Sequence, residues 1–569
     1  MAGRYADAAR LPDSVGDAPR RRFPYSGVRP FTNYVPLVPP GTLQRVPRPA
    51  PRRAGATFLQ PDHRVTSLLP DSASTSSLPR IIQGGMGIGV SNWRLANAVS
   101  RLGQLGVISG TVIDTVFVRR LQDGDPGGHV RRALAHLPIP GVADELLQRY
   151  FRPEGRLPGE PYHLLPMYKQ VVSAARQRVT VAAAFVETWL ARDGHPHPVG
   201  LNLLTKVQRP NLPTLYGAML AGVSNVIMGA GIPREIPGAL DALATHAPAT
   251  LKFDVEGLAR DESLWLTFDP ADVWPERQVP ADALHRPAFY PVVSAVSLAA
   301  TLARKSNGRV DGFVVEGPTA GGHNAPPRGA MQLDALGQPV YGERDAVDLA
   351  RIRELGLPFW VAGGVGTPEG LLAACEAGAA GIQVGTLFAY CEESGLTPSI
   401  KHEVLRGVRD GTAIVHTDPL ASPTGYPFKV VQLPAHAHDA ASRVRVCDLG
   451  YLREAVQRED GRIVYRCAAE PVDTFVAKSG TAEATVGRRF LCNGLLSDIG
   501  LGQVRGADVE PPLVTSGDDL ASLARFGGQY AAEEVVEWLM GGTARAERHE
   551  RNGASGTARA EQRELTGAS

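Results

Sequence analysis

A histidine that follows paired glycines is the residue best suited to chemistry in this chain. His323 comes directly after Gly321 and Gly322, and the apolar run 312–316 ends shortly before them. Imidazole can gain or lose a proton near neutral pH, and bare glycine backbone lets a flat ligand approach closely. Arg328 adds a fixed positive charge nearby. The pattern indicates a proton-transfer site at a strand end, with a glycine turn and a surface histidine as the alternative.

Two glycine-rich loops predict an anion site. Gly363 and Gly364 end one apolar run, and Thr367 then suits the N-cap of a helix. Gly385 and Thr386 end the next run in the same manner. Free backbone N–H groups at helix starts bind anions, and barrel enzymes commonly hold a phosphate in the loops after their last two strands. The alternative is that these glycines only allow helices to pack closely on strands.

A ring system attached to such a phosphate would reach across to the first and sixth strands. Gly85 and Met86 would line its face, and the glycine pair before His323 would line its edge. Asn202 ends the third run with an amide that both donates and accepts, as a pyrimidine-like ring edge requires. Gln83 can act in the same way. The alternative for each polar residue is a turn residue satisfied by its own backbone.

Eight short apolar runs alternate with helical patterns over residues 80–388. Such alternation predicts a (β/α)8 TIM barrel, and a doubly wound open sheet is the alternative. The chain between the second and third runs is long, with helical periodicity near 115–137 and 168–190, and predicts an insertion after strand 2. We expect Ser91 to cap the first helix and 251–287 to be irregular. The runs begin at Arg80, Leu105, Val199, Val223, Tyr290, Gly312, Pro358 and Ala380.

Composition divides the chain into four parts. Residues 1–78 are rich in Arg, Pro and Ser without apolar periodicity, so we expect a largely disordered tail, with a targeting peptide as the alternative. Residues 79–425 contain the barrel. Residues 426–540 predict an additional α-rich C-terminal subdomain that packs on the barrel or on a partner subunit of a homo-oligomer. Residues 541–569 predict a second disordered tail.

Charge and cysteine content narrow the function classes. The formal net charge is +1, which gives no argument for nucleic acid or an acidic membrane surface as a partner. No apolar run reaches membrane-spanning length. Five cysteines form no disulfide framework, so we expect a cytoplasmic protein. Cys447, Cys467 and Cys492 predict buried structural thiols, and a metal site completed by His436 or His438 is the alternative.

The segments 81–86, 321–323, 361–364 and 381–386 resemble the nitronate monooxygenase (2-nitropropane dioxygenase) family. The resemblance covers about residues 79–425, and it implies an FMN-binding TIM barrel. It also implies that His323 is the active-site base, and it places Glu316 where members often carry glutamine. Positions that match those binding the FMN phosphate are Gly363, Gly364, Gly385 and Thr386, and positions that match flavin contacts are Met86 and Asn202.

Three functions follow from these observations. The family resemblance implies an FMN-dependent monooxygenase that oxidises nitronates or nitroalkanes with O2 to carbonyl compounds and nitrite. Related barrels imply, as the alternative, an enoyl-thioester reductase that uses NAD(P)H in a polyketide or fatty-acid pathway, where an acyl carrier protein would dock. A flavin-binding scaffold without activity is the alternative from a different class. No metal is expected in any of the three.

Overall fold

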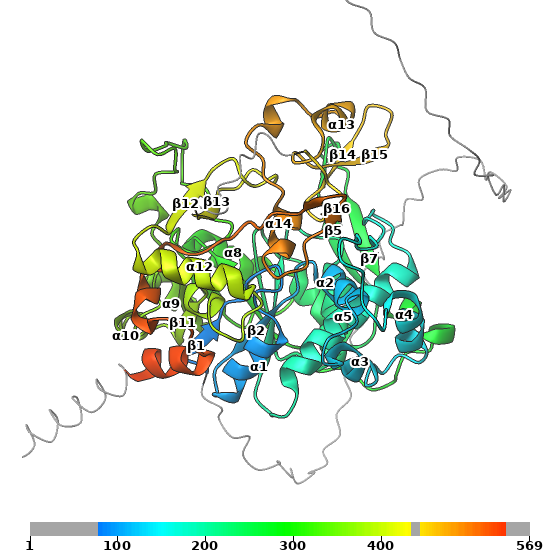
Figure 1. Ribbon diagram of the computed structural model, residues 1–569, viewed down its shortest axis with the longest axis horizontal. Coiled ribbons are helices and arrows are strands. Elements are labelled where there is room, and N and C mark those ends of the chain that lie inside the picture. The colour runs from blue at the N-terminus through cyan, green and yellow to red at the C-terminus, as the bar shows by residue number, and fades with distance from the viewer. Residues whose placement is uncertain (1–77, 434–443, 542–569) are drawn as a thin grey trace, which may run out of the picture. The chain divides into compact units, whose positions relative to one another are not determined.

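The computed structural model describes residues 78–433 and 444–541, so the two predicted tails lie almost wholly outside the described residues. Eight parallel strands form one sheet in the order β1-β11-β10-β9-β8-β4-β3-β2. The Leu105 N–H donates to the Ile81 carbonyl (3.1 Å), and the Gln83 N–H donates to the Leu105 carbonyl (2.9 Å). These bonds join the first strand to the second and close the sheet into a barrel (Figure 1). The strands are β1 (Ile81–Gln83), β2 (Gly106–Ser109), β3 (Val199–Leu204), β4 (Asn225–Gly229), β8 (Ala288–Val293), β9 (Phe313–Glu316), β10 (Phe359–Ala362) and β11 (Gly381–Val384).

At least one helix follows every barrel strand, so the predicted (β/α)8 barrel is confirmed and the open-sheet alternative is wrong. Trp360 is fully buried within the barrel, and its indole N–H donates to the Pro79 carbonyl at 2.8 Å. Ile82, Val107 and Ile227 pack in the same internal cluster. The helices are α1 (Trp93–Arg101), α2 (Ile113–Gln122), α6 (Asn211–Leu220), α7 (Ile236–Ala244), α8 (Val296–Lys305), α9 (Leu349–Arg353), α10 (Pro368–Glu376), α11 (Thr386–Ala389) and α12 (Pro398–Arg409).

The predicted insertion after strand 2 is confirmed. It adds α3 (His129–Leu134), α4 (Val142–Tyr150) and the long α5 (Ala174–Arg192) between β2 and β3. In Figure 1 these helices lie on the side of the barrel away from α9, α10 and α12. Most side chains of α5 are buried, including Thr180, Thr188 and Glu187, because other helices cover it on several sides.

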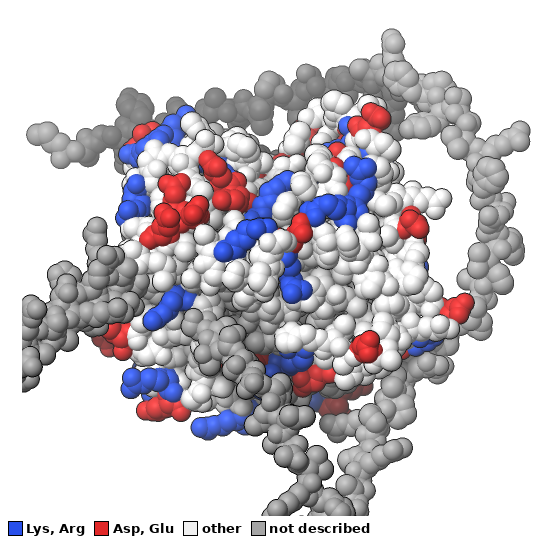
Figure 2. All heavy atoms as spheres, turned by 90° about the horizontal axis from the view of Figure 1, so that it is seen from below, with Lys and Arg blue, Asp and Glu red and all other residues white. Residues whose placement is uncertain are grey.

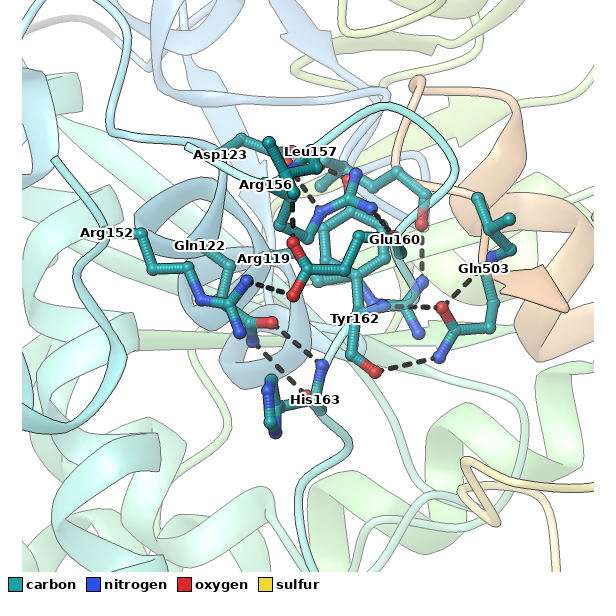
Figure 3. A network of polar contacts seen from close by, with 12 residues as sticks. Arg119, Gln122, Asp123, Arg152, Arg156, Leu157, Glu160, Tyr162, His163 and Gln503 are labelled. Carbon is teal, nitrogen blue, oxygen red and sulfur yellow. Dashed lines mark hydrogen bonds and ion pairs between the residues drawn. The ribbon is translucent and has the colours of Figure 1, made fainter. Parts of the chain in front are cut away.

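A polar network fastens the loop that precedes α5 (Figure 3). Tyr162 exchanges two hydrogen bonds with the side chain of Gln503, at 2.8 Å and 3.1 Å. The Tyr162 hydroxyl also donates to Asp123 (2.7 Å), and the Arg156 guanidinium lies 3.4 Å from the centre of the tyrosine ring. Residues far apart in sequence are therefore joined beside the barrel, and the insertion is connected to the C-terminal region.

Two local expectations are wrong. Asn92, not Ser91, caps α1, accepting from the Leu95 N–H at 3.0 Å. The Ser91 hydroxyl instead donates to the Gly84 carbonyl and accepts from the Met86 N–H, which holds the glycine turn after β1. The segment 251–287 is also more regular than expected, because alternate side chains of β5 (Ala249–Phe253) and β7 (Leu264–Phe268) are buried in an antiparallel pair.

The chain after α12 adds small sheets and short helices to the barrel. In this region β14 pairs in parallel with β6 (Val255–Glu256), so the C-terminal region shares a sheet with a segment that lies between two barrel strands. The elements are β12 (Ile414–Asp418), β13 (Phe428–Gln432), β14 (Glu454–Gln457), β15 (Ile463–Arg466), α13 (Val472–Ala477), α14 (Leu491–Ser497), β16 (Val504–Arg505), β17 (Asp508–Val509), the 3-10 helix η6 (Asp518–Phe526) and a helix at 532–541.

The surface carries mixed charge. On the face shown in Figure 2, Lys and Arg side chains are interspersed with Asp and Glu side chains. No helix within residues 78–433 and 444–541 has the length and apolar character needed to cross a membrane.

Candidate functional site

A cavity of about 260 Å³ lies at the carboxyl ends of the barrel strands. Ten of the sequence-predicted site residues line it, and they lie on, or directly after, five different strands. Backbone at strand ends is exposed to the barrel mouth, which is where such enzymes bind ligands. The ten residues are Gly85, Met86, Asn202, Gly321, Gly322, His323, Gly363, Gly364, Gly385 and Thr386.

His323 is held from the side by the chain that follows β12. The backbone on both sides of it pairs with the start of β13, through the Asn324 N–H to the Pro427 carbonyl (3.0 Å) and the Lys429 N–H to the Gly322 carbonyl (2.9 Å). Its Nε2 lies 2.7 Å from the Ser422 hydroxyl, and its ring meets Phe428 edge-on at 4.9 Å. These contacts leave little freedom for the imidazole to rotate.

The imidazole is neutral at ordinary pH. Burial, aided by the positive charge of Lys206, lowers the pKa of His323 to about 3. A neutral ring can accept a proton or share one in a hydrogen bond. It does not carry the positive charge that would hold an anionic nitronate by ion pairing.

The loop after β1 is packed tightly against Asn202. The Asn202 amide donates to the Gly85 carbonyl at 2.8 Å, and a Cβ on Gly85 would lie 2.1 Å from the Asn202 Cβ. Glycine is therefore required at position 85 by packing. The interpretation of Gln83 as a ring-edge contact is wrong, because its side chain is fully buried and bonds Ser91, the Gly84 carbonyl and the Val107 N–H.

The two glycine loops present backbone donors to the cavity at the ends of β10 and β11. Thr367 caps α10 as predicted, accepting from the Gly370 N–H at 2.9 Å. Gly363 and Gly364 both have positive φ, 95° and 68°, which side chains disfavour. A Cβ at Gly385 would meet only Met86, at 3.6 Å, so the backbone there is open to the cavity. This backbone has the character of an anion cradle.

A carboxyl group lies at this cradle, which no sequence pattern indicated. The Thr386 hydroxyl donates to Asp519 Oδ1 at 2.6 Å and accepts from the Gly517 N–H at 3.2 Å. Burial raises the pKa of Asp519. The backbone donors and the cavity volume fit a flavin phosphate, and the fit is complete when Asp519 is protonated, because an ionised carboxyl would repel the phosphate.

Burial at the cavity also favours the neutral form of two carboxyl groups. Burial raises the pKa of Glu316 to about 7 and that of Asp498 to about 8. Among the described residues that line the cavity there is no lysine or arginine. Arg328, expected to supply a charge at the rim, instead donates to the Ser294 carbonyl at 2.7 Å outside the cavity.

Other lining residues were not singled out from sequence. Gln383 on β11 has a buried Oε1 without a hydrogen-bond partner among the described residues, and Ser516 Oγ is in the same position. Gln383 is part of the motif 381–386. Because side chains alternate between the two faces of a strand, its position in the strand could have indicated that it points inward. Ser516 gave no such signal. Both polar atoms suit hydrogen bonds to a ligand.

The C-terminal region completes the wall of the cavity with Tyr451, Leu491, Cys492 and Leu495. Cys467 is buried and Cys447 packs in the same small cluster, and both are free thiols like Cys492. No group of three or more His, Cys, Asp or Glu side chains in the described ranges could hold a metal ion. The alternative ligands His436 and His438 lie outside the described residues.

Sequence comparison connects part of the chain with known enzymes. Residues 271–419 match the family model described as nitronate monooxygenase. A "(3aS,4S,5R,7aS)-5-hydroxy-7a-methyl-1-oxo-octahydro-1H-indene-4-carboxyl-CoA dehydrogenase" of Rhodococcus jostii is 31% identical over 25% of this chain and 34% of its own length. The nitronate monooxygenase of Pseudomonas aeruginosa is 35% identical over 21% of this chain and 32% of its own length. These matches therefore span about a third of each relative.

Structural comparison gives more distant similarities. FabK from Thermotoga maritima has 15% identity and a TM-score of 0.40, covering 83% of this chain and 95% of that one. Nitroalkane oxidase from Streptomyces ansochromogenes has 15% identity and a TM-score of 0.41, covering 83% of this chain and 97% of that one.

Proposed function

We propose that this chain, in which residues 271–419 belong to the nitronate monooxygenase family, is an FMN-dependent oxidoreductase. Its first candidate substrates are nitroalkanes and their nitronates, oxidised with O2 to carbonyl compounds and nitrite. The observation that supports this most is that a neutral imidazole and two backbone anion cradles line the same cavity. The cradles can bind a phosphate and the imidazole can take a proton. A flavin enzyme that acts on a carbon acid requires both functions.

The protein would hold the cofactor by its two ends. Backbone N–H groups at Gly363, Gly364, Gly385 and Thr386 would bind the phosphate, and Met86 would lie against the ring system. Bound FMN supplies the two-electron chemistry that no side chain provides. The Asn202 amide nitrogen already bonds Gly85, so its carbonyl oxygen is the atom available to a ring N–H.

His323 would move the proton. Because its ring is neutral, one nitrogen can accept the α-proton of a neutral nitroalkane, while Ser422 holds the other nitrogen in place. The developing negative charge on the substrate would stabilise the resulting imidazolium. A positioned base of this kind contributes on the order of a hundredfold or more to the rate.

An enoyl-thioester reductase using NAD(P)H is the second candidate function. Apolar side chains such as Ile88, Leu491 and Leu495 form part of the cavity wall, which suits an acyl chain. The Rhodococcus jostii relative is named for a carboxyl-CoA substrate, which is a thioester. Here His323 would deliver a proton to the substrate carbon, and a carrier protein could present the acyl group.

Spectroscopy of the purified protein separates these functions. Flavin absorbance supports either enzyme, whereas a colourless protein that cannot be loaded with FMN contradicts both. Under anaerobic conditions, bleaching by a nitronate but not by NADPH supports the monooxygenase. Rapid bleaching by NADPH, followed by reoxidation with an enoyl thioester, would support the reductase and contradict the monooxygenase.

A further inference from the structure

A chain of hydroxyl groups leads from His323 to a partly buried lysine. Ser422 Oγ lies 2.7 Å from His323 Nε2 and 2.8 Å from Thr424 Oγ1. The Lys206 ammonium donates to the same Thr424 Oγ1 at 3.3 Å. Each hydroxyl can donate one proton and accept another. A continuous path for protons therefore connects the cavity-lining imidazole with an ionisable group behind it.

The direction of these bonds depends on the charge of Lys206. A charged ammonium has only donors, so Thr424 accepts from it and keeps its own O–H free to donate to Ser422, which can then donate to His323 Nε2. Since the ring is neutral, the proton on it then resides at Nδ1. A neutral amine can accept instead, which allows every bond to reverse and leaves the proton at Nε2 and a bare Nδ1.

We propose that Lys206 sets the tautomer of His323 through the two intervening hydroxyl groups. The consequence is that one site can act both as an acid and as a base, and this consequence rests on the proposed function. With Lys206 charged, the ring offers an N–H to the substrate. With Lys206 neutral, the ring offers a lone pair.

The proton transfer balances in both directions. When His323 gives its Nδ1 proton to a substrate carbanion, Nε2 takes the Ser422 proton, and Ser422 takes that of Thr424. Thr424 then takes a proton from Lys206, which becomes a neutral amine and regains a proton from solvent. Abstraction of a substrate proton runs through the same four bonds in reverse. Through this relay the imidazole can pass one proton on while it receives another.

The environment of Lys206 allows this change near neutral pH. Burial lowers its pKa to about 7, and within residues 78–433 and 444–541 no ion pair to Lys206 opposes that effect. The ring of Tyr426 lies against the ammonium at 2.6 Å from its centre and stabilises the charged form. Other charged groups on the neighbouring segments have contacts of their own: Arg488 with the carbonyls of Leu420 and Ser422, Arg489 with Asp418, Lys429 with Asp518, and Asp254 with Gln208.

The tautomer can be measured directly by 15N NMR on the full-length protein labelled at histidine. The chain has 14 histidines, so the His323 signals are assigned by their loss in His323→Ala. We expect Nδ1 to carry the proton in mildly acidic solution and Nε2 to carry it in mildly alkaline solution, with a midpoint at the pKa of Lys206, about 7. A tautomer that stays the same over this range would overturn the proposal, whether or not flavin binds.

Variants test the path. Lys206→Met and Thr424→Val should each abolish the switch, and Thr424→Val does so while the lysine is kept. Lys206→Arg, which keeps a permanent charge, should hold the Nδ1–H form throughout. Lys401→Met removes another partly buried lysine, bonded to the Glu392 and Ser394 carbonyls, and should leave the switch intact. Persistence of the switch in Thr424→Val would refute the hydroxyl route.

Steady-state kinetics provide an independent test of the relay once a substrate is known. In the native enzyme, the kcat for the proton-transfer step should change about tenfold across the titration of Lys206. Thr424→Val should flatten this pH profile and leave KM within about twofold, because the hydroxyl lies behind the imidazole. A purely structural role for Thr424 would lower activity equally at every pH, and that result would contradict the proposal.

Discussion

At the scale of single residues, the proposed chemistry depends on one imidazole whose surroundings keep it neutral. Burial and the Lys206 charge both disfavour its protonation, and Ser422 fixes its Nε2. We therefore expect His323→Ala to lower turnover of a neutral carbon acid tenfold or more, because a positioned proton acceptor is lost. FMN content should stay unchanged, since backbone groups of the glycine loops, and not the imidazole, would bind the phosphate. Steady-state kinetics with flavin quantification would measure both.

The variant Asn324→Ala serves as a control next to the imidazole. The Asn324 side chain bonds the Ala320 carbonyl rather than a group of the relay, so this change should affect folding of the turn more than proton transfer. Turnover by His323→Ala that equals the native rate would remove the imidazole from the mechanism.

At the scale of elements, the start of η6 lies beside the glycine loops that we propose as the phosphate site. Asp519 accepts from the Thr386 hydroxyl there, and burial raises its pKa. An acid with a raised pKa holds its proton to higher pH, and it repels a phosphate only after losing that proton. We expect Asp519→Asn to tighten FMN binding about tenfold at about pH 8, with the difference shrinking as the pH falls. Fluorescence titration would measure the dissociation constant.

Riboflavin separates the phosphate from the ring in this experiment. Because riboflavin lacks the phosphate, its affinity should not respond to Asp519→Asn. Asp508→Asn, on the exposed β17, is a matched control for charge. Equal gains for FMN and riboflavin would show that the carboxyl acts on the ring instead.

A buried ion pair connects the insertion to α2. Arg176 on α5 lies 2.6 Å from Asp114 on α2. Burial alone would raise the pKa of Asp114, but the Arg176 charge and hydrogen bonds from Tyr168 and Tyr451 hold it below its usual value. Arg176→Met leaves that charge buried without its partner, so we expect a loss of about 3 kcal/mol in the free energy of unfolding. Urea unfolding would measure this.

Arg178, two residues further along the same helix, is the control. Its pair with Glu145 is partly solvent-exposed, so Arg178→Met should cost below about 1 kcal/mol. Similar losses in both variants would mean that the buried pair has no special role in fastening the insertion.

At the scale of the whole molecule, buried carboxyls link stability to pH. Asp498 is almost fully buried, and burial raises its pKa to about 8. Between the ordinary pKa of aspartate and that value, the unfolded chain releases the proton while the folded protein retains it, so rising pH destabilises the fold. Asp498→Asn cannot ionise and can still accept from the Leu513 N–H. We expect it to raise the free energy of unfolding at neutral pH by on the order of 2 kcal/mol.

Thermal unfolding followed across the pH range would test this prediction. The native protein should lose stability from mildly acidic to mildly alkaline conditions, and the variant should show a flatter profile. A native profile that rises over the same range would mean that Asp498 is ionised in the folded protein.

The sequence by itself predicted the barrel, which the structure confirms, and pointed to segments that lie together at one cavity. Runs such as 312–316 and 380–388 are mostly apolar and rich in β-branched residues, which suits strands buried on both faces. Glycines at the ends of these runs are local signals of exposed backbone, so the cradle residues and His323 were found without any contact information. The prediction that Ser91 caps the first helix was wrong because a serine hydroxyl suits a helix cap and a turn equally well.

Only the tertiary structure decided what surrounds those residues. The environment of His323 depends on Lys206 and Ser422, which are distant in sequence, and the cradle is covered by Asp519 from near the other end of the described chain. Desolvation and charge act through space over a few ångströms. Neither leaves a periodic signal along the chain, so the proton relay and the carboxyl at the cradle became visible only when the fold brought these segments together.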